Sequence, residues 1–269
     1  MLNELPQLLD FYQTDYSVAD RWLPFAETQL LLQFVNQTQR PLLHYWTLPQ
    51  TVILGLRDQR LPQITAGLNL LQQQGWHYFY RNSGGLGVVS DAGVLNVSLC
   101  LPATIKLTIT EGYQLMSELV QSCWPTLPIQ TGEISQSYCP GTYDLSIAGR
   151  KIAGIAQRRS RGATAIMLYL SVTGTQQKRS ELMAQFYRAS QGQPPDFPEI
   201  DPQVMANLAD FLPAALTVDL AQQQLSQTLR QAGHELSTTA WQQFCQQPNF
   251  KQQQQQAWQN LASYNQSIL

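Results

Sequence analysis

The chain has 269 residues, 43% of them hydrophobic, which is enough to bury a substantial core in one large domain or in one domain with an extension. Its net charge of −2 argues against binding to nucleic acid, because phosphate backbones attract clustered positive charge. No apolar run approaches the roughly 20 residues of a membrane helix, and residues 1–10 lack the features of a signal peptide, so we expect a cytoplasmic protein.

Helical and strand-like patterns alternate over the first two thirds of the chain. Pro24 is acceptable in the first turn of a helix, Thr108 or Thr110 is suited to cap another, and Gly75 stops a helical pattern. The predicted helices span residues 24–39, 61–74 and 109–123; the predicted strands span residues 42–56 (two strands), 76–80, 88–89, 94–101, 144–147, 151–158 and 163–172. A tight turn at residues 148–150 joins two of these strands.

From Gly174 onward the pattern becomes helical. The run Gln252–Gln256 is typical of a solvated helix face. The predicted helices span residues 176–190, 202–211, 221–232 and 238–262, with a loop containing Pro194, Pro195 and Pro198 after the first of them. This change of pattern predicts a core over residues 1–175 and a helical extension over residues 176–269 that packs on the core.

The four cysteines form no C-x-x-C pair and have no zinc-site spacing, and disulfides are rare in a reducing cytosol. We therefore treat Cys100, Cys123, Cys139 and Cys245 as separate thiols. Three of them are interpreted as small buried hydrophobic residues. Cys139 differs, because a Pro-Gly pair follows it and places its side chain in a turn, where functional groups tend to lie.

Cys139 is also close in sequence to a lysine, Lys151, between two strand-like stretches. The thiolate is the reacting form of cysteine, and a neighbouring ammonium favours it over the thiol. The local sequence therefore makes Cys139 a candidate nucleophile with Lys151 as its cationic partner, and it leaves a structural role for this cysteine open.

A glycine-rich turn, residues 81–87, precedes a strand at residues 94–101. It is neither a P-loop nor a dinucleotide-binding turn, because no Gly-Lys-Ser/Thr follows it and the next residues are strand-like. Its glycines suit a hairpin with positive φ, or a wall along which an elongated substrate lies close to the backbone. Arg81 is suited either to bind a carboxylate or carbonyl or to cap a strand end.

The histidines give no catalytic or metal-binding pattern. His44, His77 and His234 lie in strand or helix patterns, and none is beside a glycine-flanked serine. No paired histidine and carboxylate spacing indicates a catalytic metal. We expect a protein without a bound metal.

Three ordered motifs are more specific together than each is alone. They are R-x-S-G-G-x-x-V from Arg81, D-x-G-x-L-N from Asp91 and G-x-K-I-A-G-x-A-Q-R from Gly149. In this order they resemble the lipoate ligase and octanoyltransferase superfamily over residues 21–172. The segment 138–147 most resembles the cysteine-dependent octanoyl-[GcvH]:protein N-octanoyltransferases, the amidotransferases of LipL type.

This resemblance implies an α+β fold with a mixed β-sheet flanked by helices, and a catalytic core over residues 1–175. It implies that Cys139 takes an octanoyl or lipoyl group from the H protein of the glycine cleavage system and passes it to E2 lipoyl domains, without ATP or another cofactor. The acyl chain is expected in an apolar tunnel beside the sheet, and Lys151 is expected to polarise the reacting carbonyl. Substrate-binding residues are expected at Arg81, Ser83, Gly84, Gly85, Asn96, Asp144 and Gly154.

One departure from the superfamily bears on the donor. ATP-dependent lipoate ligases usually carry a Tyr-His-Asp triplet after the glycine turn, whereas this chain has Val89-Ser90-Asp91. Three alternatives nevertheless stay open: octanoyl transfer from acyl carrier protein to the H protein, ATP-dependent lipoate ligation, and noncatalytic binding of lipoyl domains.

Overall fold

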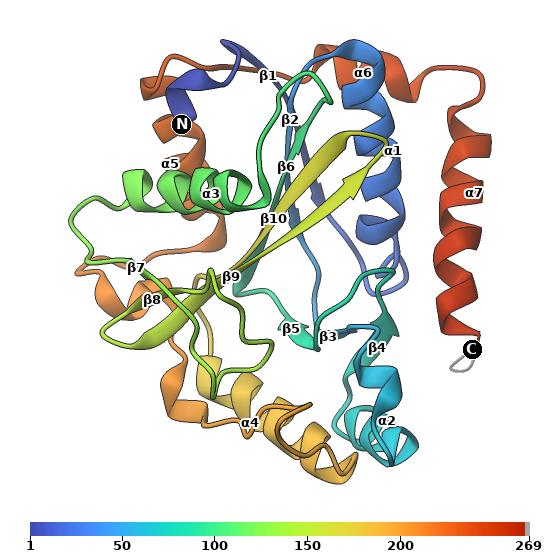
Figure 1. Ribbon diagram of the computed structural model, residues 1–269, viewed down its shortest axis with the longest axis vertical. Helices are drawn as coiled ribbons and strands as arrows, with labels where there is room; N and C mark the ends of the chain where they lie inside the picture. The colour runs from blue at the N-terminus through green and yellow to red at the C-terminus, as the bar shows by residue number, and fades with distance from the viewer. Residues whose placement is uncertain (267–269) are drawn as a thin grey trace.

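The computed structural model describes residues 1–266, which form a central mixed β-sheet with helices packed on both faces (Figure 1). The strands are β1 (Leu8–Asp15), β2 (Leu42–Thr47), β3 (Thr51–Leu54), β4 (His77–Tyr80), β5 (Val88–Ser90), β6 (Val94–Leu101), β7 (Gln130–Thr131), β8 (Leu145–Ile147), β9 (Arg150–Ser160), β10 (Ala163–Ser171) and β11 (Glu235–Ser237). The helices are α1 (Leu23–Thr38), α2 (Ile64–Gln73), α3 (Ile109–Cys123), α4 (Gln176–Ala189), α5 (Val218–Gln231), α6 (Thr239–Cys245) and α7 (Phe250–Ala262).

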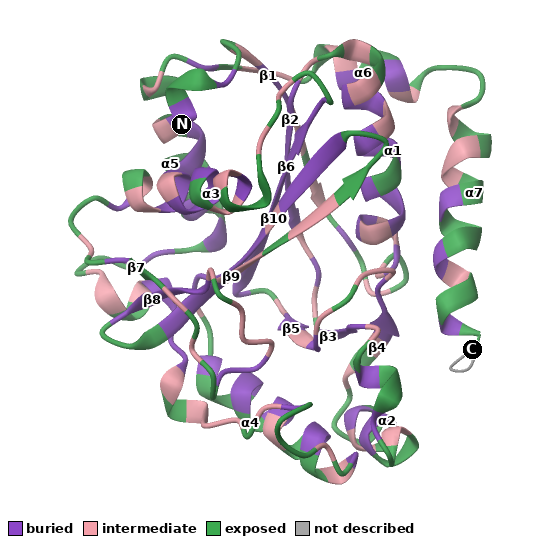
Figure 2. Ribbon diagram, in the orientation of Figure 1, coloured by how far each residue is buried: buried purple, intermediate pink, exposed green. Residues whose placement is uncertain are grey.

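The large sheet has the strand order β11-β1-β2-β6-β10-β9-β8-β7. Its two faces are covered by different helices because side chains alternate along a strand. On β2, Leu42 packs in a cluster with α1 and α6, whereas Leu43 packs in a cluster with α3 and α5. The central strands β2, β6 and β10 are therefore almost entirely buried, whereas β7, β11 and the second half of β9 are partly or fully exposed (Figure 2).

A small sheet of order β4-β3-β5 extends the fold below the large sheet in Figure 1. It packs in one apolar cluster with α2 and α4, through residues such as Leu54, Leu71 and Phe186. This arrangement matters for the site, because the glycine-rich turn at residues 81–87 connects β4 with β5.

The segment after residue 175 closes around the core. β11 pairs in parallel with β1 at one edge of the large sheet, and α7 lies along α1, where Trp258 stacks on Trp22. The glutamine run lies on α7, with Gln253 and Gln254 half-buried and the others exposed. Within residues 1–266, no helix has the length and hydropathy needed to span a bilayer.

The structure confirms the α+β fold, with its mixed sheet flanked by helices, and most predicted elements, including the Thr108 cap of α3. It also contains β1, β7 and β11, which sequence patterns did not indicate. The predicted helix at residues 202–211 is wrong. Two short 3₁₀ helices, Pro202–Val204 and Leu208–Phe211, occupy this stretch, because the Ala206 N–H donates to the carbonyl of Lys151 on β9 rather than within a helix.

The predicted helix at residues 238–262 is also wrong as one element. It is divided into α6 and α7, and Pro248 lies in the break. Proline lacks an N–H, and its ring clashes with the preceding turn of a helix, so a continuous helix through residue 248 is disfavoured.

Candidate active site

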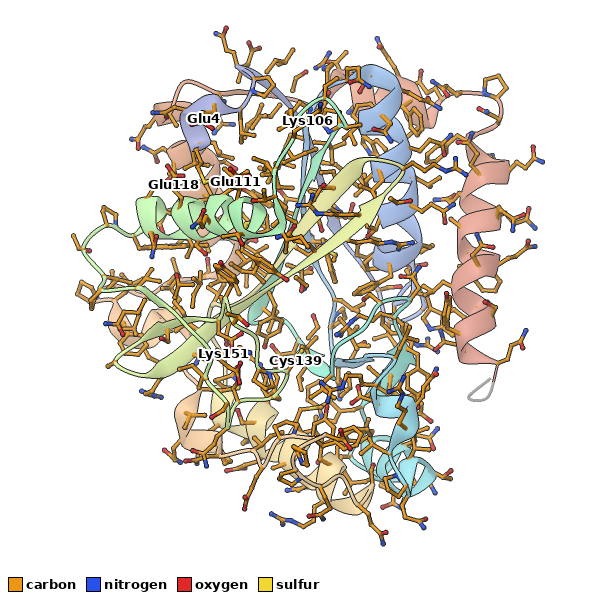
Figure 3. The ribbon with its side chains drawn as sticks, in the orientation of Figure 1. Glu4, Lys106, Glu111, Glu118, Cys139 and Lys151 are labelled. Carbon is orange, nitrogen blue, oxygen red and sulfur yellow. The ribbon has the colours of Figure 1, made fainter. Side chains whose placement is uncertain are left out.

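Cys139 lies in the loop that joins β7 to β8, beside Lys151 (Figure 3). Its φ is 49°, a left-handed conformation that is uncommon for a residue with a Cβ. Pro140 follows directly and further restricts the backbone of the residue before it. Strained backbone of this kind persists only where surrounding contacts hold it, and it is frequent at functional sites.

Those contacts come mainly from Lys151, the second residue of β9, whose side chain is only 3% exposed. Its ammonium donates hydrogen bonds to the Cys139 carbonyl at 2.8 Å, the Tyr138 carbonyl at 3.2 Å and the Ser137 hydroxyl at 3.2 Å. Turn residues Ala148 and Gly149, both with positive φ, return the chain from β8 to β9. A buried cation is thus fixed on the backbone of the thiol-bearing residue.

Asp144 completes this arrangement from the other end of the loop. Its carboxylate forms an ion pair with Lys151 at 3.0 Å and accepts hydrogen bonds from the backbone N–H groups of Gly141 and Ile134. Burial raises the pKa of Asp144 above its usual value, and the Lys151 charge opposes that rise. The pair connects both sides of the Cys139 loop to β9.

The glycine-rich turn is organised by Arg81, which is buried directly after β4. The Arg81 guanidinium donates to the carbonyls of Gly84 at 2.9 Å, Leu86 at 3.0 Å and Ile53 at 3.3 Å. The sequence indicated that Arg81 could bind a carboxylate or a carbonyl. In the structure it binds carbonyls of the chain's own backbone. Arg81 holds the shape of the turn.

Gly85 brings this turn against the thiol. It has φ of 86°, and a Cβ at this position would lie 2.7 Å from an Arg81 nitrogen and 3.7 Å from the Cys139 sulfur. A larger residue would therefore collide with Arg81 and strain the backbone. Two segments more than fifty residues apart in sequence meet at Cys139.

The other predicted binding residues are distributed around this centre. A Cβ at Gly154 on β9 would lie 3.7 Å from both the Lys151 nitrogen and an Asp144 oxygen. Ser83 and Gly84 lie in the glycine-rich turn, where the Ser83 carbonyl accepts from the Leu56 N–H. Asn96 lies on β6 and donates to the Ser90 hydroxyl at 3.5 Å, so its described contact is with the end of β5 in the small sheet.

A buried polar network behind Cys139 was not found from the sequence. The Tyr138 and Tyr169 hydroxyls lie 2.7 Å apart, and Gln176 on α4 donates to Tyr138. Arg179, one helical turn later and 1% exposed, donates to Gln176 and pairs with Asp91 at 2.6 Å. In the sequence, the i, i+3 spacing of Gln176 and Arg179 indicates that the two side chains share one face of a helix. Only the tertiary structure shows that this face of α4 is buried.

A second polar cluster supports the glycine-rich turn from the side of α4. Asp58 is fully buried and accepts hydrogen bonds from the Gly55 N–H and the Tyr187 hydroxyl, while that hydroxyl accepts from the Gly87 N–H. Burial raises the pKa of Asp58 to about 6, and the hydrogen bonds only partly oppose this rise.

The other thiols are poorly suited to nucleophilic attack. Burial raises the pKa of Cys100 to about 12, and burial raises the pKa values of Cys123 and Cys245 to about 11. Thiols with such pKa values are almost entirely protonated near neutral pH. These three cysteines therefore fit a structural role.

Two of the three histidines have structural environments. Burial lowers the pKa of His44 to about 3, and both ring nitrogens of His234 lie near backbone carbonyls, those of Pro6 and Leu2. Over residues 1–266, no group of three or more His, Cys, Asp or Glu side chains is placed to hold a metal ion.

Comparison with solved structures supports the fold. The chain has a TM-score of 0.67 with a lipoate-protein ligase A bound with ATP, at 16% identity, with 97% of this chain and 99% of the other covered. It has a TM-score of 0.64 with the bipartite lipoate protein ligase of Thermoplasma acidophilum, at 17% identity, with 99% and 98% covered. At these identities the likeness concerns the fold alone.

Comparison of sequences is more specific. The chain is 42% identical over 221 residues to the octanoyl-[GcvH]:protein N-octanoyltransferase of Anoxybacillus flavithermus, with 80% of each chain covered. It is 42% identical over 196 residues to the lipoyl-[GcvH]:protein N-lipoyltransferase of Listeria monocytogenes, with 70% of each covered. Residues 20–230 match the lipoyl protein ligase A/B catalytic domain, and the chain belongs to this family.

Proposed function

We propose that this protein is an acyltransferase of protein lipoylation, which moves an octanoyl group from the H protein of the glycine cleavage system to a lysine of E2 lipoyl domains in the cytoplasm. The observation that carries the proposal is the meeting of Cys139, the Lys151 ammonium and the glycine-rich turn at one place. The sequence relatives named for octanoyl and lipoyl transfer support the choice of acyl group and of donor.

In this reaction the Cys139 sulfur attacks the carbonyl carbon of the octanoyl-lysine amide. The carbon–nitrogen bond breaks, and the H-protein lysine leaves as the amine after it takes up a proton. The product is an octanoyl thioester on Cys139. The amine of the E2 lysine then attacks this thioester, a new amide forms, the thiolate leaves, and the amine gives up a proton. No nucleotide is consumed, because one amide is exchanged for another.

Lys151 has two tasks in this scheme. It holds the strained Cys139 backbone through the carbonyls of Tyr138 and Cys139, and it supplies positive charge where negative charge develops on the attacked carbonyl. Asp144 is a positioning residue, since it fixes the ammonium and two backbone groups of the loop.

The acyl chain requires an apolar surface beside the thiol. Cys139 packs against a buried apolar cluster that includes Leu86, Val94, Tyr169 and Met183. We place the octanoyl chain along this cluster, next to the small sheet, because burial of its methylene groups contributes about 0.8 kcal/mol each.

The test is transfer by the purified full chain from octanoylated H protein to an apo E2 lipoyl domain, without ATP or magnesium. We expect E2 octanoylation and a covalent octanoyl adduct on Cys139, both detected by intact-mass measurement. Cys139→Ala should abolish both, whereas Cys245→Ala is the matched control and should retain them. Normal transfer by Cys139→Ala would exclude the covalent mechanism.

Different donors distinguish the remaining candidates. Strict dependence on ATP together with use of free octanoate or lipoate would identify a ligase. Efficient transfer only from octanoyl-acyl carrier protein to the H protein would identify the other octanoyltransferase reaction. Binding of lipoyl domains without any transfer would leave a noncatalytic binding protein.

A further inference from the structure

A basic hairpin stands out on this weakly acidic chain. Arg158, Arg159 and Arg161 lie within four residues where β9 turns into β10, and all three are at least partly exposed. Over residues 1–266 none of them forms an ion pair with a carboxylate. Unpaired positive charge concentrated in this way favours an acidic partner.

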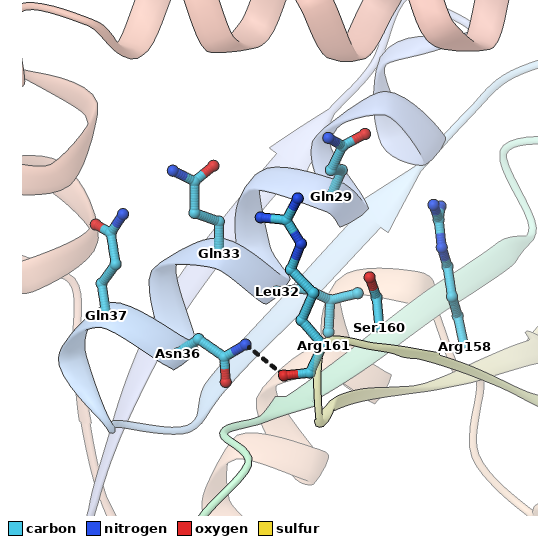
Figure 4. Close-up of a pocket in the computed structure, with 8 residues that line it drawn as sticks. All are labelled: Gln29, Leu32, Gln33, Asn36, Gln37, Arg158, Ser160 and Arg161. Carbon is cyan, nitrogen blue, oxygen red and sulfur yellow. Dashed lines mark hydrogen bonds between the residues drawn. The ribbon is translucent and has the colours of Figure 1, made fainter.

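Two of these arginines line a pocket of about 460 Å³ between the hairpin and α1 (Figure 4). Figure 4 shows Arg158 and Arg161 extending to the same side as Gln29 and Gln33 of α1. The lining residues in the described structure include no carboxylate, and most carry amide, hydroxyl or guanidinium groups. A surface of this composition offers hydrogen-bond donors and positive charge to carboxylate side chains.

The turn of the hairpin is unusual for its sequence. Arg161 and Gly162 both have positive φ, 51° and 85°, and they form the two-residue connection between β9 and β10. Such turns prefer asparagine, aspartate or glycine at the first position, and arginine is not among the favoured residues. The Arg161 carbonyl is held by Asn36 of α1 at 3.3 Å. The position therefore carries a long cationic side chain against its local backbone preference.

The hairpin is connected to the candidate active site. Arg158 donates to the Asn82 side chain at 3.0 Å, and Asn82 follows Arg81 in the glycine-rich turn that contacts the thiol. Lys151 and Arg158 are seven positions apart on β9, a distance of about 23 Å along an extended strand. A folded partner that covers about 800 Å² of surface spans a comparable length.

We propose that this pocket and the arginines of the hairpin form the docking site for an acidic surface of the carrier protein whose octanoyl-lysine enters at Cys139. The proposal rests on the proposed function, because it takes the acyl-carrying protein as the occupant. The carboxylates of that protein pair with Arg158 and Arg161, and its modified lysine extends toward the glycine-rich turn.

The test is the dissociation constant for octanoylated H protein, measured by calorimetry on the full chain carrying Cys139→Ala, so that no transfer occurs. Adding Arg161→Glu should raise the dissociation constant about tenfold, and the effect should shrink as salt is added. Lys178→Glu changes the net charge equally at an exposed position on α4 and should leave binding unchanged.

Arg161→Asn separates docking from folding. Asparagine suits the positive φ of this turn, so the variant should keep or raise the thermal midpoint while it weakens binding. An unchanged dissociation constant in both Arg161 variants would overturn the docking site. Because binding is measured without the thiol, this result is independent of whether Cys139 forms an acyl adduct, which tests the proposed function separately.

Discussion

At the scale of single residues, the candidate site depends on a cysteine held in an unfavourable backbone conformation. Cys139 has positive φ and precedes a proline. The Lys151 ammonium binds the carbonyls of Tyr138 and Cys139, which lie on the two sides of the Cys139 α-carbon. The charge of Lys151 is balanced by Asp144, which is equally buried. The same ion pair therefore maintains loop geometry and fixes a cation on the backbone of Cys139.

The first prediction concerns this cation. Removing only Lys151 would leave the buried Asp144 charge unpaired, at a loss of about 3–5 kcal/mol of stability, so we choose the double variant Lys151→Met/Asp144→Asn. It should stay folded and transfer octanoate about 100-fold more slowly, since the loop loses the ammonium that binds its carbonyls and the attacked carbonyl loses a positive charge.

The measurement is the rate of octanoyl transfer from octanoylated H protein to an E2 lipoyl domain, read by intact mass. Cys245→Ala is the control, because it removes a thiol and retains the Lys151–Asp144 pair. The same transfer rate in the wild type and in the double variant would show that Lys151 contributes neither to the chemistry nor to the loop geometry that the chemistry needs.

Asp58 gives a prediction about pH and stability. Its folded-state pKa of about 6 lies above the usual 3.8, so the folded protein binds this proton more tightly than the unfolded chain does. Stability contributed by protonated Asp58 is therefore lost as the pH rises through this window. Between about pH 4 and pH 7, the wild type should lose about 2 kcal/mol of unfolding free energy relative to Asp58→Asn.

Urea unfolding of both proteins across this pH range provides the comparison. Asparagine can accept from the Gly55 N–H through its amide oxygen and donate to the Tyr187 hydroxyl through its amide nitrogen, so the variant should fold normally. A pH-independent difference between the two proteins would mean that Asp58 titrates near its usual value.

At the scale of elements, the C-terminal helix protects the exposed edge of the small sheet. β4 is an edge strand, and Asn265, just after α7, accepts from the Tyr80 N–H at 2.7 Å and donates to the Tyr80 carbonyl at 2.9 Å. One side chain thus satisfies two backbone groups of the edge in the way a neighbouring strand would. Tyr80 directly precedes Arg81, which shapes the glycine-rich turn.

Asn265→Ala should lower the unfolding free energy by about 2 kcal/mol, because buried backbone groups of Tyr80 lose their partners. Amide hydrogen exchange should also become faster at β4. Asn260→Ala, at an exposed position on α7, should change stability by less than about 0.5 kcal/mol. Equal effects of the two substitutions would show that the Asn265 contact does not secure the strand.

At the scale of the whole molecule, residues after 175 supply parts of the core. α4 contributes Gln176 and Arg179 to the network behind Cys139, α5 and α6 cover opposite faces of the large sheet, and β11 extends that sheet. The division at residue 175 marks a change of sequence pattern. The division into a core over residues 1–175 and a helical extension over residues 176–269 stays a prediction.

We expect a fragment of residues 1–175 to lack cooperative folding. It would expose the apolar surface covered by Leu225, Leu229, Trp241 and Phe244, and it would leave Asp91 without Arg179. Loss of near-ultraviolet circular dichroism and strong binding of a hydrophobic dye are the expected signs. A sharp, cooperative unfolding transition of the fragment would instead identify residues 1–175 as a self-sufficient domain.

The sequence by itself determined most local elements and predicted Cys139 as the reactive residue. Periodicity and capping residues define α1, α2 and α3, and the turn around Cys139 with a following lysine marks the thiol, because these signals lie within a few residues of one another. Only the tertiary structure decided how distant segments combine. β1 and β11 are strands because they pair in the large sheet, and residues 202–211 contact β9 instead of forming one helix. The contact between Gly85 and Cys139 and the burial of Arg179 likewise depend on packing between segments far apart in the chain, which local patterns do not encode.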